Sequence, residues 1–512
     1  LDFNPGWHFS CPDGRDFDVT LPHDAMLNTT RNTEPGFTWF LLAGWRGNDY
    51  TYTKNLHITS ELINKHLVLE FEGVYCMTTV TVNDRPAAEK AYGYTPFTVE
   101  LDGLLREGDN TIEVTAHVPQ DGHNRWYTGG GIYRPVHLLV VPKAHFALDY
   151  HGAPGLRITP VLSADLKTAE IHAEAWVAGT AQSVQFTLGE ETLSAAVTDG
   201  KAEGTFKLEN VHLWDGVNDP YLYKMQATLD SGDAVEANFG CRTIAFDAEK
   251  GFILNGHPYR LCGAARHQDR QGLGNALTEK EHDEDMALLR EMGANTVRLA
   301  HYQHAQYFYD LCDKYGLVAW AEIPYITEHM PEGRANTLSQ MTELVVQNYN
   351  HPSIVCWGLS NEITGSGKTE DLVENHKLLN DLCHKLDATR PTTMAHIFML
   401  DANDPLVFLP DIRSYNLYYG WYVGEGDQND AWFDEFHKNH PDAVIGLSEY
   451  GADANPAYQS AKPAKGDWSE GYQAVYHEHM LKMWADRPYI WAMHCWNMFD
   501  FGADGRDEGG KP

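Results

Sequence analysis

The sequence predicts a multidomain fold in which two β-sandwich domains precede a (β/α)8 TIM barrel, and three observations lead to it. At about 100–200 residues per domain, a chain of 512 residues corresponds to about three domains. Up to about residue 245, short segments of alternating apolar and polar residues recur between turn signals, which is typical of sandwiches. From about residue 250, apolar strands alternate with helical patterns, and eight such units over about 260 residues match a TIM barrel.

The alternating segments fall into two groups, separated internally by turn clusters such as NDRP and REGDN. The first group comprises residues 66–74, 78–86, 110–118 and 136–142, and the second comprises residues 168–179, 184–191 and 223–230. The second group lies within about 100 residues, which is the size of an immunoglobulin-like sandwich. We therefore expect a β-sandwich at residues 1–142, an immunoglobulin-like domain at residues 143–245 and the barrel at residues 246–512.

Local signals support the barrel units. The segment TEKEHDEDMALLREMG starts with Thr278 and has Glu281 three residues later, which predicts a helix over 278–293 with a capping box and Gly293 as its C-cap. A second helix is expected at 305–316. The eight strands are expected near residues 260–267, 295–302, 317–324, 354–362, 392–398, 412–419, 443–451 and 490–501. The last helix of the barrel is apparently missing, so we expect the natural protein to continue beyond residue 512.

Composition limits the partners. The net charge is −34, from 72 acidic and 38 basic residues, which argues against nucleic acids and anionic membranes because both bind basic surfaces. No stretch approaches the roughly 20 apolar residues of a membrane helix, and the first residues lack the features of a secretion signal. The eight cysteines are scattered and form no CxxC pair. We expect a reduced, cytoplasmic protein that forms a homo-oligomer.

The functional hypothesis starts from the segment IVCWGLSNEI, an apolar strand that ends in Asn361 and Glu362. The segment AVIGLSEYGAD repeats this pattern and places Glu449 at the end of the seventh strand. Barrel strands carry their chemistry at their C-terminal ends, so the two glutamates are expected to face one another. Glycoside hydrolysis needs one carboxylic acid at the leaving oxygen and one carboxylate at the anomeric carbon. Further polar and aromatic residues at strand ends are His267, Arg298, His301, Tyr302, Glu322, Asn416, Tyr418, Tyr419, Trp496 and Asn497.

Structural explanations compete with this hypothesis. A single glutamate at a strand end is more often an ion-pair partner than a catalyst, but two at equivalent positions favour catalysis. His267 and His301 could serve structural hydrogen bonds, and Trp496 could fill the top of the barrel. A non-catalytic carbohydrate-binding protein on the same scaffold is therefore a remote alternative.

Several motifs resemble those of glycoside hydrolase family 2, which contains β-galactosidases, β-glucuronidases and β-mannosidases. They are LPHDAML (21–27), RWYTGGGIYRPVHL (125–138), FILNGHPYRLCGAARHQD (252–269), NTVRLAHY, WGLSNE, YNLYYGWYVG (415–424), SEYGAD (448–453) and CWNMFDF (495–501). The resemblance spans nearly the whole chain. It implies a jelly-roll-like sugar-binding domain, an immunoglobulin-like domain and a catalytic TIM barrel.

The resemblance also implies roles for the strand-end residues. Glu362 matches the acid/base and Glu449 the nucleophile of a retaining double displacement. Asn361 would bind the 2-hydroxyl of the sugar, Tyr418 would contact the nucleophile, and Arg298 would keep it ionised. The residues His267, His301, Asn416 and Trp496 would line the sugar subsite.

The N-terminal loop near GGGIYRP is expected to differ from its counterpart in family members. Galactosidases place an aspartate shortly before this motif, whereas this chain has Asn124 and Arg125 there and Asp121 further back.

For the sugar we expect an exo-acting β-galactosidase, with a β-hexuronidase acting on glucuronides or galacturonides as the alternative. After the eighth strand, Asp504, Asp507 and Glu508 surround Arg506, and a uronate carboxylate would need an unpaired cation. No cofactor is expected. A magnesium site is possible in such enzymes but not supported here, because Glu328 and His329 in the loop EIPYITEH are shifted from the family pattern.

Overall fold

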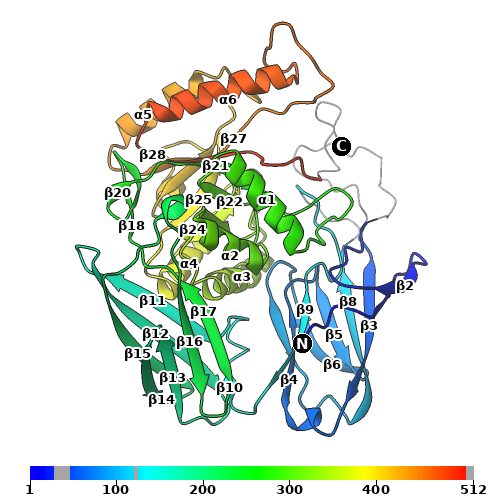
Figure 1. The fold of residues 1–512 in the computed structure, drawn as a ribbon. Coiled ribbons are helices and arrows are strands. Elements are labelled where there is room, and N and C mark those ends of the chain that lie inside the picture. Colours follow the sequence, from blue (N-terminus) through cyan, green and yellow to red (C-terminus); the bar gives the residue numbers. More distant parts are fainter. Residues whose placement is uncertain (28–46, 120–124, 503–512) are drawn as a thin grey trace.

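The computed structural model describes residues 1–27, 47–119 and 125–502. Figure 1 shows an N-terminal sandwich in blue and a second sandwich in green, both beside a barrel formed by the rest of the chain. The predicted multidomain fold, with two sandwiches followed by a TIM barrel, is confirmed. The domain boundaries at residues 142 and 245 stay predictions.

The N-terminal sandwich consists of two antiparallel sheets, in the orders β2-β1-β3-β8-β5-β6 and β7-β4-β9. Its strands are β1 (Trp7–Ser10), β2 (Asp16–Val19), β3 (Asp49–Ile58), β4 (His66–Phe71), β5 (Thr78–Val82), β6 (Arg85–Lys90), β7 (Phe97–Glu100), β8 (Gly108–His117) and β9 (Val136–Val141), with a 3-10 helix η1 (Leu62–Asn64). The single segment predicted at 78–86 is two strands. Asn83 and Asp84 have φ of 51° and 62°, which makes the tight turn of a hairpin.

The second sandwich also has two antiparallel sheets. One contains β10 (His145–Phe146), β11 (Leu156–Leu162), β12 (Thr168–Ala178) and β15 (Lys201–Glu209). The other contains β13 (Ser183–Leu188), β14 (Glu191–Ala196), β16 (Tyr223–Leu229) and β17 (Ala234–Phe239). The 3-10 helix η2 (Gly216–Asn218) lies between β15 and β16. After β17, the short sheet of β18 (Ile244–Asp247), β19 (Gly251–Leu254) and β20 (His257–Pro258) leads into the barrel.

Eight parallel strands close the barrel, with β21 paired to both β22 and β28. They are β21 (Leu261–Arg266), β22 (Thr296–Leu299), β23 (Val318–Glu322), β24 (Ile354–Asn361), β25 (Thr392–Ile397), β26 (Arg413–Asn416), β27 (Ile445–Tyr450) and β28 (Ile490–Cys495). Nearly every residue of these strands is buried, which explains why each reads as an unbroken apolar run. All eight strands lie where the sequence predicts them.

The helices outside the barrel are α1 (Glu279–Glu291), α2 (Gln306–Tyr315), α3 (Arg334–Gln347), α4 (Glu370–Leu386), α5 (Gln428–Asn439) and α6 (Glu470–Ala485), with 3-10 helices η3 (Pro331–Gly333) and η4 (Pro405–Phe408). The capping box of Thr278 and Glu281 is confirmed, and Gly293 follows the C-cap Met292 with φ of 80°. One βα unit differs from the prediction: η4, not an α-helix, joins β25 to β26. Pro405 and Pro410 limit helix formation there.

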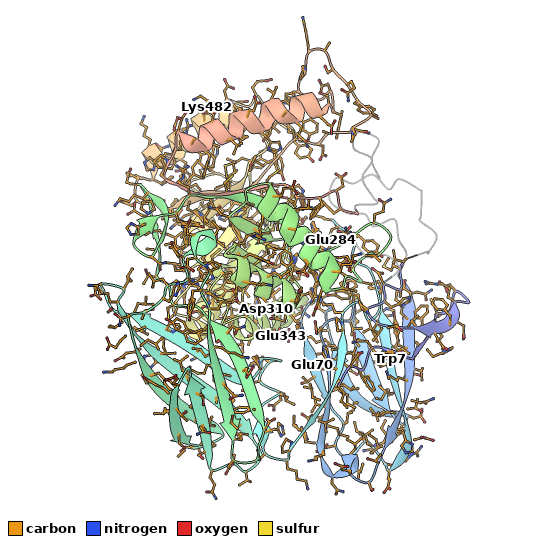
Figure 2. The ribbon with its side chains drawn as sticks, viewed as in Figure 1. Trp7, Glu70, Glu284, Asp310, Glu343 and Lys482 are labelled. Atoms are coloured by element: carbon orange, nitrogen blue, oxygen red, sulfur yellow. The ribbon has the colours of Figure 1, made fainter. Side chains whose placement is uncertain are left out.

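Polar contacts join the N-terminal sandwich to the barrel. Glu343 of α3 accepts hydrogen bonds from Lys90 and, at 2.5 Å, from the Thr95 hydroxyl; Figure 2 labels Glu343 where the two parts meet. Asp24 of the sandwich accepts a hydrogen bond of 2.8 Å from the backbone N–H of Asn275, and burial raises the pKa of this aspartate to about 6. These contacts hold the sandwich against the barrel.

All eight cysteines lie in described parts of the chain and are free. Burial raises the pKa of Cys262 to about 11 and that of Cys495 to about 12, so these thiols stay protonated and pack as small apolar groups. Among the described residues, no helix has the length and apolar character needed to cross a membrane. The compartment and the oligomeric state stay predictions.

Candidate active site

A cavity of about 270 Å³ lies at the C-terminal ends of the barrel strands. Six residues of the predicted site line it: Glu362, Glu449, His267, His301, Tyr418 and Trp496. The other three, Arg298, Asn361 and Asn416, are buried behind this lining and hydrogen bond to it or to one another. The rest of the wall is mostly apolar and consists of Arg125, Trp126, Ile397, Phe398, Met399, Tyr422, Val423 and Phe501.

Glu449 lies near the end of β27, and both of its carboxylate oxygens are held. Oε1 accepts a hydrogen bond of 2.8 Å from Nη1 of Arg298, and Oε2 accepts one of 2.7 Å from the Tyr418 hydroxyl. Burial raises the pKa of Glu449 to about 7, and the nearby charge of Glu362 adds to the rise, whereas Arg298 and Tyr418 oppose it. Held in this way, the carboxylate has one orientation toward the cavity, as a nucleophile requires.

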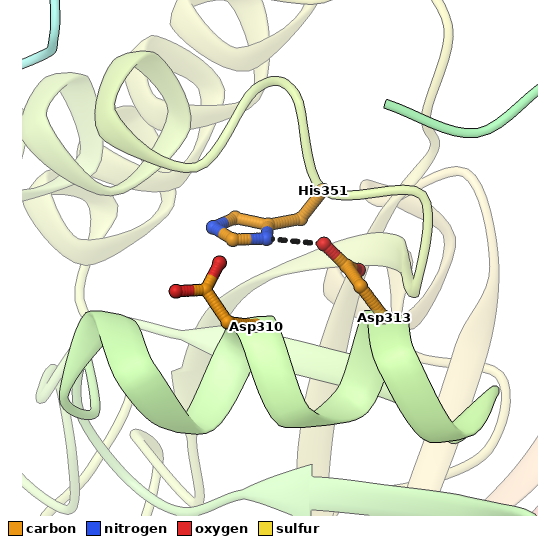
Figure 3. Close-up of side chains that lie close together, drawn as sticks. All are labelled: Asp310, Asp313 and His351. Atoms are coloured by element: carbon orange, nitrogen blue, oxygen red, sulfur yellow. Dashed lines mark hydrogen bonds and ion pairs between the residues drawn. The ribbon is translucent and has the colours of Figure 1, made fainter. Parts of the chain in front are cut away.

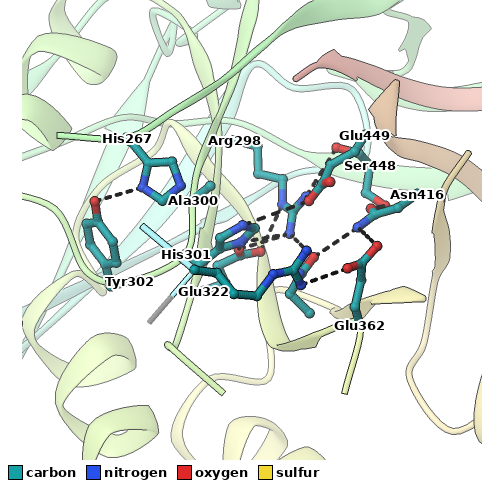
Figure 4. Close-up of polar contacts among 12 residues, drawn as sticks. His267, Arg298, Ala300, His301, Tyr302, Glu322, Glu362, Asn416, Ser448 and Glu449 are labelled. Atoms are coloured by element: carbon teal, nitrogen blue, oxygen red, sulfur yellow. Dashed lines mark hydrogen bonds and ion pairs between the residues drawn. The ribbon is translucent and has the colours of Figure 1, made fainter. Parts of the chain in front are cut away.

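Glu362 directly follows β24, and its carboxylate is also held on both oxygens. Oε1 accepts a hydrogen bond of 3.1 Å from Nδ2 of Asn416, and Oε2 accepts one of 2.8 Å from Nη1 of Arg125. The φ of Glu362 is 45°, a conformation that residues other than glycine rarely adopt and that costs energy. The bend turns the side chain out of the strand direction and into the cavity, where it faces Glu449 (Figure 4).

Arg298 on β22 is the centre of the buried charge network shown in Figure 4. Its Nε and Nη2 donate to the two oxygens of Glu322 at 3.0 and 2.9 Å. Nη2 also donates to Oδ1 of Asn361 at 2.8 Å, while Nη1 holds Glu449. Arg298 and Glu322 are both fully buried, so each needs the charge of the other. Sequence reasoning noted Glu322 at a strand end but missed this role.

The two histidines contribute hydrogen bonds rather than charge. Burial, together with nearby arginines, lowers the pKa of both His267 and His301 well below 6.5, so both are neutral near pH 7. Nδ1 of His301 contacts Glu322 at 2.6 Å, and its ring stacks on Trp496. Nδ1 of His267 contacts the Tyr302 hydroxyl at 2.9 Å. Nε2 of His267 is buried with no hydrogen-bond partner among the described residues, which makes it available to a sugar hydroxyl.

A short hydrogen-bond chain orients the amide of Asn416. The hydroxyl of Ser448 donates to its Oδ1 at 2.7 Å, so Nδ2 is left to donate to Glu362 and, at 3.2 Å, to Oδ1 of Asn361. Asn416 is therefore placed to position the predicted acid/base. Ser448 was not predicted as a site residue. The sequence signal was its position directly before Glu449, at the end of an apolar strand.

The N-terminal sandwich contributes two further residues to the cavity, Arg125 and Trp126. Trp126 packs against His267 and His301 at ring distances of 5.4 and 5.5 Å. The sequence predicted that this loop differs from that of galactosidases, and Arg125 is the residue that enters the site. Asp121 and Asn124 lie outside the described residues. The signal in the sequence was the position of Arg125 at the start of the RWYTGGGIYRP motif.

The loop after β23 offers little for a metal. His329 is held between the hydroxyl of Tyr325 at 2.5 Å and the carboxylate of Asp371 at 2.6 Å, and Glu328 is exposed. A histidine engaged on both ring nitrogens is not free to bind an ion.

One group of possible metal ligands occurs among the described residues, formed by Asp310, Asp313 and His351, and Figure 3 shows it. His351 precedes β24, so the group lies at the opposite end of the barrel strands from Glu362. Asp313 already contacts Nδ1 of His351 at 2.6 Å and accepts a hydrogen bond of 3.0 Å from the backbone N–H of Ser353. This group is explained as an ion pair that fixes the start of β24.

Models of known families match the chain in three segments. Residues 247–509 match "Glycosyl hydrolases family 2, TIM barrel domain". Residues 28–145 match "Glycosyl hydrolase 2 galactose-binding domain-like", and residues 154–242 match "Glycosyl hydrolases family 2".

Known proteins of similar sequence and structure carry two kinds of name. The chain is 36% identical to a "Beta-glucuronidase" of Bacteroides fragilis over 94% of this chain and 75% of that protein. The structure superposes with a TM-score of 0.93 on an "FMN-binding beta-glucuronidase" from Facaelibacterium prausnitzii L2-6, at 36% identity, covering 100% of this chain and 81% of that one. A "putative beta-galactosidase" from Bacteroides fragilis gives a TM-score of 0.90 at 32% identity, with the same coverage of 100% and 81%.

Proposed function

The chain belongs to glycoside hydrolase family 2, and from that premise we propose that it is a retaining, exo-acting β-hexuronidase that releases terminal β-glucuronides or β-galacturonides. Its activity as a glycoside hydrolase follows from the family. The observation that carries the catalytic assignment is the pair Glu362 and Glu449, which line one cavity from the ends of β24 and β27.

In the first step, the Glu449 carboxylate attacks the anomeric carbon and forms a covalent glycosyl ester. The glycosidic bond breaks, and Glu362 gives its proton to the leaving oxygen. In the second step, the Glu362 carboxylate takes a proton from water, whose oxygen attacks the anomeric carbon and releases Glu449. The β configuration is retained because two inversions cancel.

The contacts of each glutamate suit its step. Arg298 and Tyr418 hold both oxygens of Glu449, which favours the ionised nucleophile. Nε2 of His267 has no partner among the described residues and can hydrogen bond to a sugar hydroxyl. Asn361, which directly precedes Glu362, would hydrogen bond to the 2-hydroxyl of the sugar. Trp496 and Trp126 provide aromatic walls for the C–H faces of a sugar.

The choice of a uronide departs from the β-galactoside predicted from the sequence. The curated relative that matches 94% of the chain is named a β-glucuronidase, as is the structural neighbour with a TM-score of 0.93. The sequence-based preference depended on Asp504, Arg506, Asp507 and Glu508, which lie outside the described residues. A β-galactosidase is the second candidate, because one neighbour carries that name.

We propose no metal or cofactor for the reaction, since two carboxylates and water account for its chemistry. Dialysis against a chelator should therefore leave kcat/KM unchanged. A loss restored by magnesium would contradict this proposal.

The test of the sugar compares nitrophenyl β-glucuronide, β-galacturonide, β-galactoside and β-glucoside, which share one leaving group. We expect kcat/KM for a uronide to exceed that for either neutral hexoside by at least about tenfold, or about 1.4 kcal/mol in the transition state. A tenfold preference for the galactoside would favour the second candidate. Binding of a glycoside without its hydrolysis would favour the carbohydrate-binding alternative.

The two glutamates should respond differently to mutation. Glu449→Gln removes the attacking atom, so turnover should fall by more than about 10³-fold for every leaving group. Glu362→Gln removes the proton donor, so alkyl glycosides should lose far more activity than nitrophenyl glycosides, which leave without protonation. Equal losses on the two substrate types for Glu362→Gln would refute its role as the acid. Proton NMR of the first product should show the β anomer.

A further inference from the structure

We propose that the junction between the second sandwich and the barrel holds a second binding site, which takes the oxyanion group of a small organic anion beside Arg242 and Arg390. The site is a cavity of about 220 Å³. It shares no lining residue with the catalytic cavity. The inference goes beyond the proposed function and does not depend on which sugar the enzyme releases.

The cavity lies at the end of the barrel strands opposite to the two catalytic glutamates. Pro352 precedes β24 and Arg390 precedes β25, and both residues line the cavity. The second sandwich contributes residues of β11 and of the segment from the end of β17 to the start of β18. Beside the cavity, the backbone N–H of Ile158 on β11 donates to Oδ1 of Asn350 at 2.8 Å. The two domains therefore form the cavity together.

The charge of the cavity wall is unusual for this chain. Arg242 and Arg390 line the cavity, whereas no aspartate or glutamate of the described chain does. The chain as a whole has 72 acidic and 38 basic residues. A concave wall that carries charge of one sign concentrates ions of the opposite sign. In so acidic a chain, a wall with two cations and no acid favours an anionic ligand.

Arg242 has no acidic partner among the described residues. Its Nη2 donates to the backbone carbonyl of Ile354 at 2.7 Å, and its Nε donates to that of Pro352. Both acceptors are neutral, so neither balances the charge of the guanidinium. Burial, together with the nearby charge of Arg390, lowers the pKa of Arg242 to about 9. A bound anion would offset the cost of this unbalanced, partly buried cation.

The carboxylates whose charges reach Arg242 already have other partners. Asp387 accepts a hydrogen bond of 2.7 Å from Nη1 of Arg390. Asp313 contacts Nδ1 of His351 at 2.6 Å. Neither carboxylate lines the cavity. An oxyanion in the cavity would therefore be the direct counterion that Arg242 lacks.

The rest of the wall indicates an organic ligand rather than a bare ion. Ile158, Phe239 and Ile244 supply apolar surface, and Tyr349 supplies an aromatic ring. One water needs about 10–15 Å³ of cavity, so a cavity of about 220 Å³ has room for more than an oxyanion group. Guanidinium groups bind phosphate and carboxylate groups in two-point contact. The ligand class is therefore a small phosphate monoester or carboxylate with an apolar body.

The experiment measures the Kd of phenyl phosphate, benzoate and benzyl alcohol by isothermal titration calorimetry at constant ionic strength. The three probes share an aromatic ring and differ in the charged group. We expect wild type to bind at least one of the anions with a Kd of about 1 mM or tighter, and to bind the alcohol at least about tenfold more weakly. Tighter binding of phenyl phosphate would identify phosphate monoesters as the ligand class, and tighter binding of benzoate would identify carboxylates.

Two variants locate the site. Arg242→Met removes the unbalanced cation, and Pro160→Glu adds a carboxylate to the cavity wall while both arginines stay in place. Each should weaken binding of the anion by at least about tenfold. The control is Val161→Glu, which adds the same charge at the next residue of β11, where the side chain is 50% exposed and does not line the cavity. Val161→Glu should bind the anion as wild type does.

Binding of neither anion to wild type would overturn the inference. Equal affinity for benzyl alcohol would do so as well, since apolar contact alone would then explain binding. Equal affinity of Pro160→Glu and wild type would place the anion elsewhere and also overturn it. If Arg242→Met does not fold, the comparison of Pro160→Glu with Val161→Glu still decides. None of these results bears on the proposed function, which the nitrophenyl glycosides test separately.

Discussion

At the scale of single residues, the site depends on fixed donors that hold two carboxylates in different surroundings. Glu449 has Arg298 and Tyr418 as donors, whereas Glu362 has Asn416 and Arg125. Donors that are already oriented need no rearrangement as charge moves during the reaction, which is how protein groups lower a barrier. The same residues therefore set the geometry of the pair, and Arg298 and Tyr418 also lower the pKa of Glu449 against the effect of its burial.

The pH dependence of activity should report Glu449. Burial raises its pKa to about 7, so the nucleophile becomes protonated and kcat/KM should fall as pH drops below about 7. Tyr418 donates to Glu449 and lowers that pKa. Tyr418→Phe should therefore shift the acid limb of the kcat/KM profile to higher pH and reduce the plateau by about 10–100-fold, the effect of one hydrogen bond to a charged group. An acid limb unmoved in Tyr418→Phe would contradict this. Tyr458→Phe, at an exposed tyrosine after β27, is the control.

At the scale of elements, the strand ends place the site and glycine gives it room. A Cβ at Gly358 of β24 would lie 2.5 Å from Cβ of Glu322, so only glycine allows the charge partner of Arg298 to pack there. The positive φ of Glu362 then turns the chain at the end of the same strand. Both features explain why an apolar strand can end in a carboxylate that faces a cavity.

The first helix of the barrel depends on its capping box. Thr278 and Glu281 satisfy each other's backbone N–H at the start of α1. Thr278→Ala should lower the free energy of unfolding by about 0.5–2 kcal/mol, measured as a shift of the urea midpoint of barrel unfolding. The control is Lys280→Ala, which removes only the exposed ion pair with Glu284 (3.8 Å) in the same helix. It should change the free energy of unfolding by less than about 0.5 kcal/mol. Equal shifts for the two variants would argue against the cap.

At the scale of the whole molecule, the catalytic cavity belongs to two domains. The barrel supplies both glutamates, and the N-terminal sandwich supplies Arg125 and Trp126. Two polar contacts fix the position of the sandwich on the barrel: Thr95 donates to Glu343, and the backbone N–H of Asn275 donates to Asp24. Activity should therefore depend on contacts that lie outside the cavity.

Glu343→Ala should test this dependence, because it leaves Lys90 without its partner at a half-buried site. We expect the free energy of unfolding to fall by about 1–3 kcal/mol. We also expect kcat/KM to fall as the sandwich loosens around the site, with no change in the identity of the products. Glu374→Ala on α4, whose ion pair with Lys377 is 3.8 Å long and exposed, is the control. Full activity in a destabilised Glu343→Ala would show that the sandwich docks independently of this contact.

The sequence by itself determined the order of the elements and the candidate glutamates. Strand pattern, capping and turns depend on residues within a few positions of one another, so they can be read locally. The eight barrel strands and the cap at Thr278 were predicted for that reason. Glu362 and Glu449 were found because equivalent strand ends of a barrel converge on one face.

The tertiary structure decided what depends on distant contacts. Arg125 meets Glu362 across 237 positions, Arg298 meets Glu449 across 151, and no local pattern relates such pairs. The neutral state of His267 and His301 likewise follows from burial by several elements at once. The short η4 between β25 and β26 is a local exception, because Pro405 and Pro410 limit helix formation within the segment itself. The sequence specifies which side chains are present. Their protonation states and their contacts depend on residues that the fold brings together from distant parts of the chain.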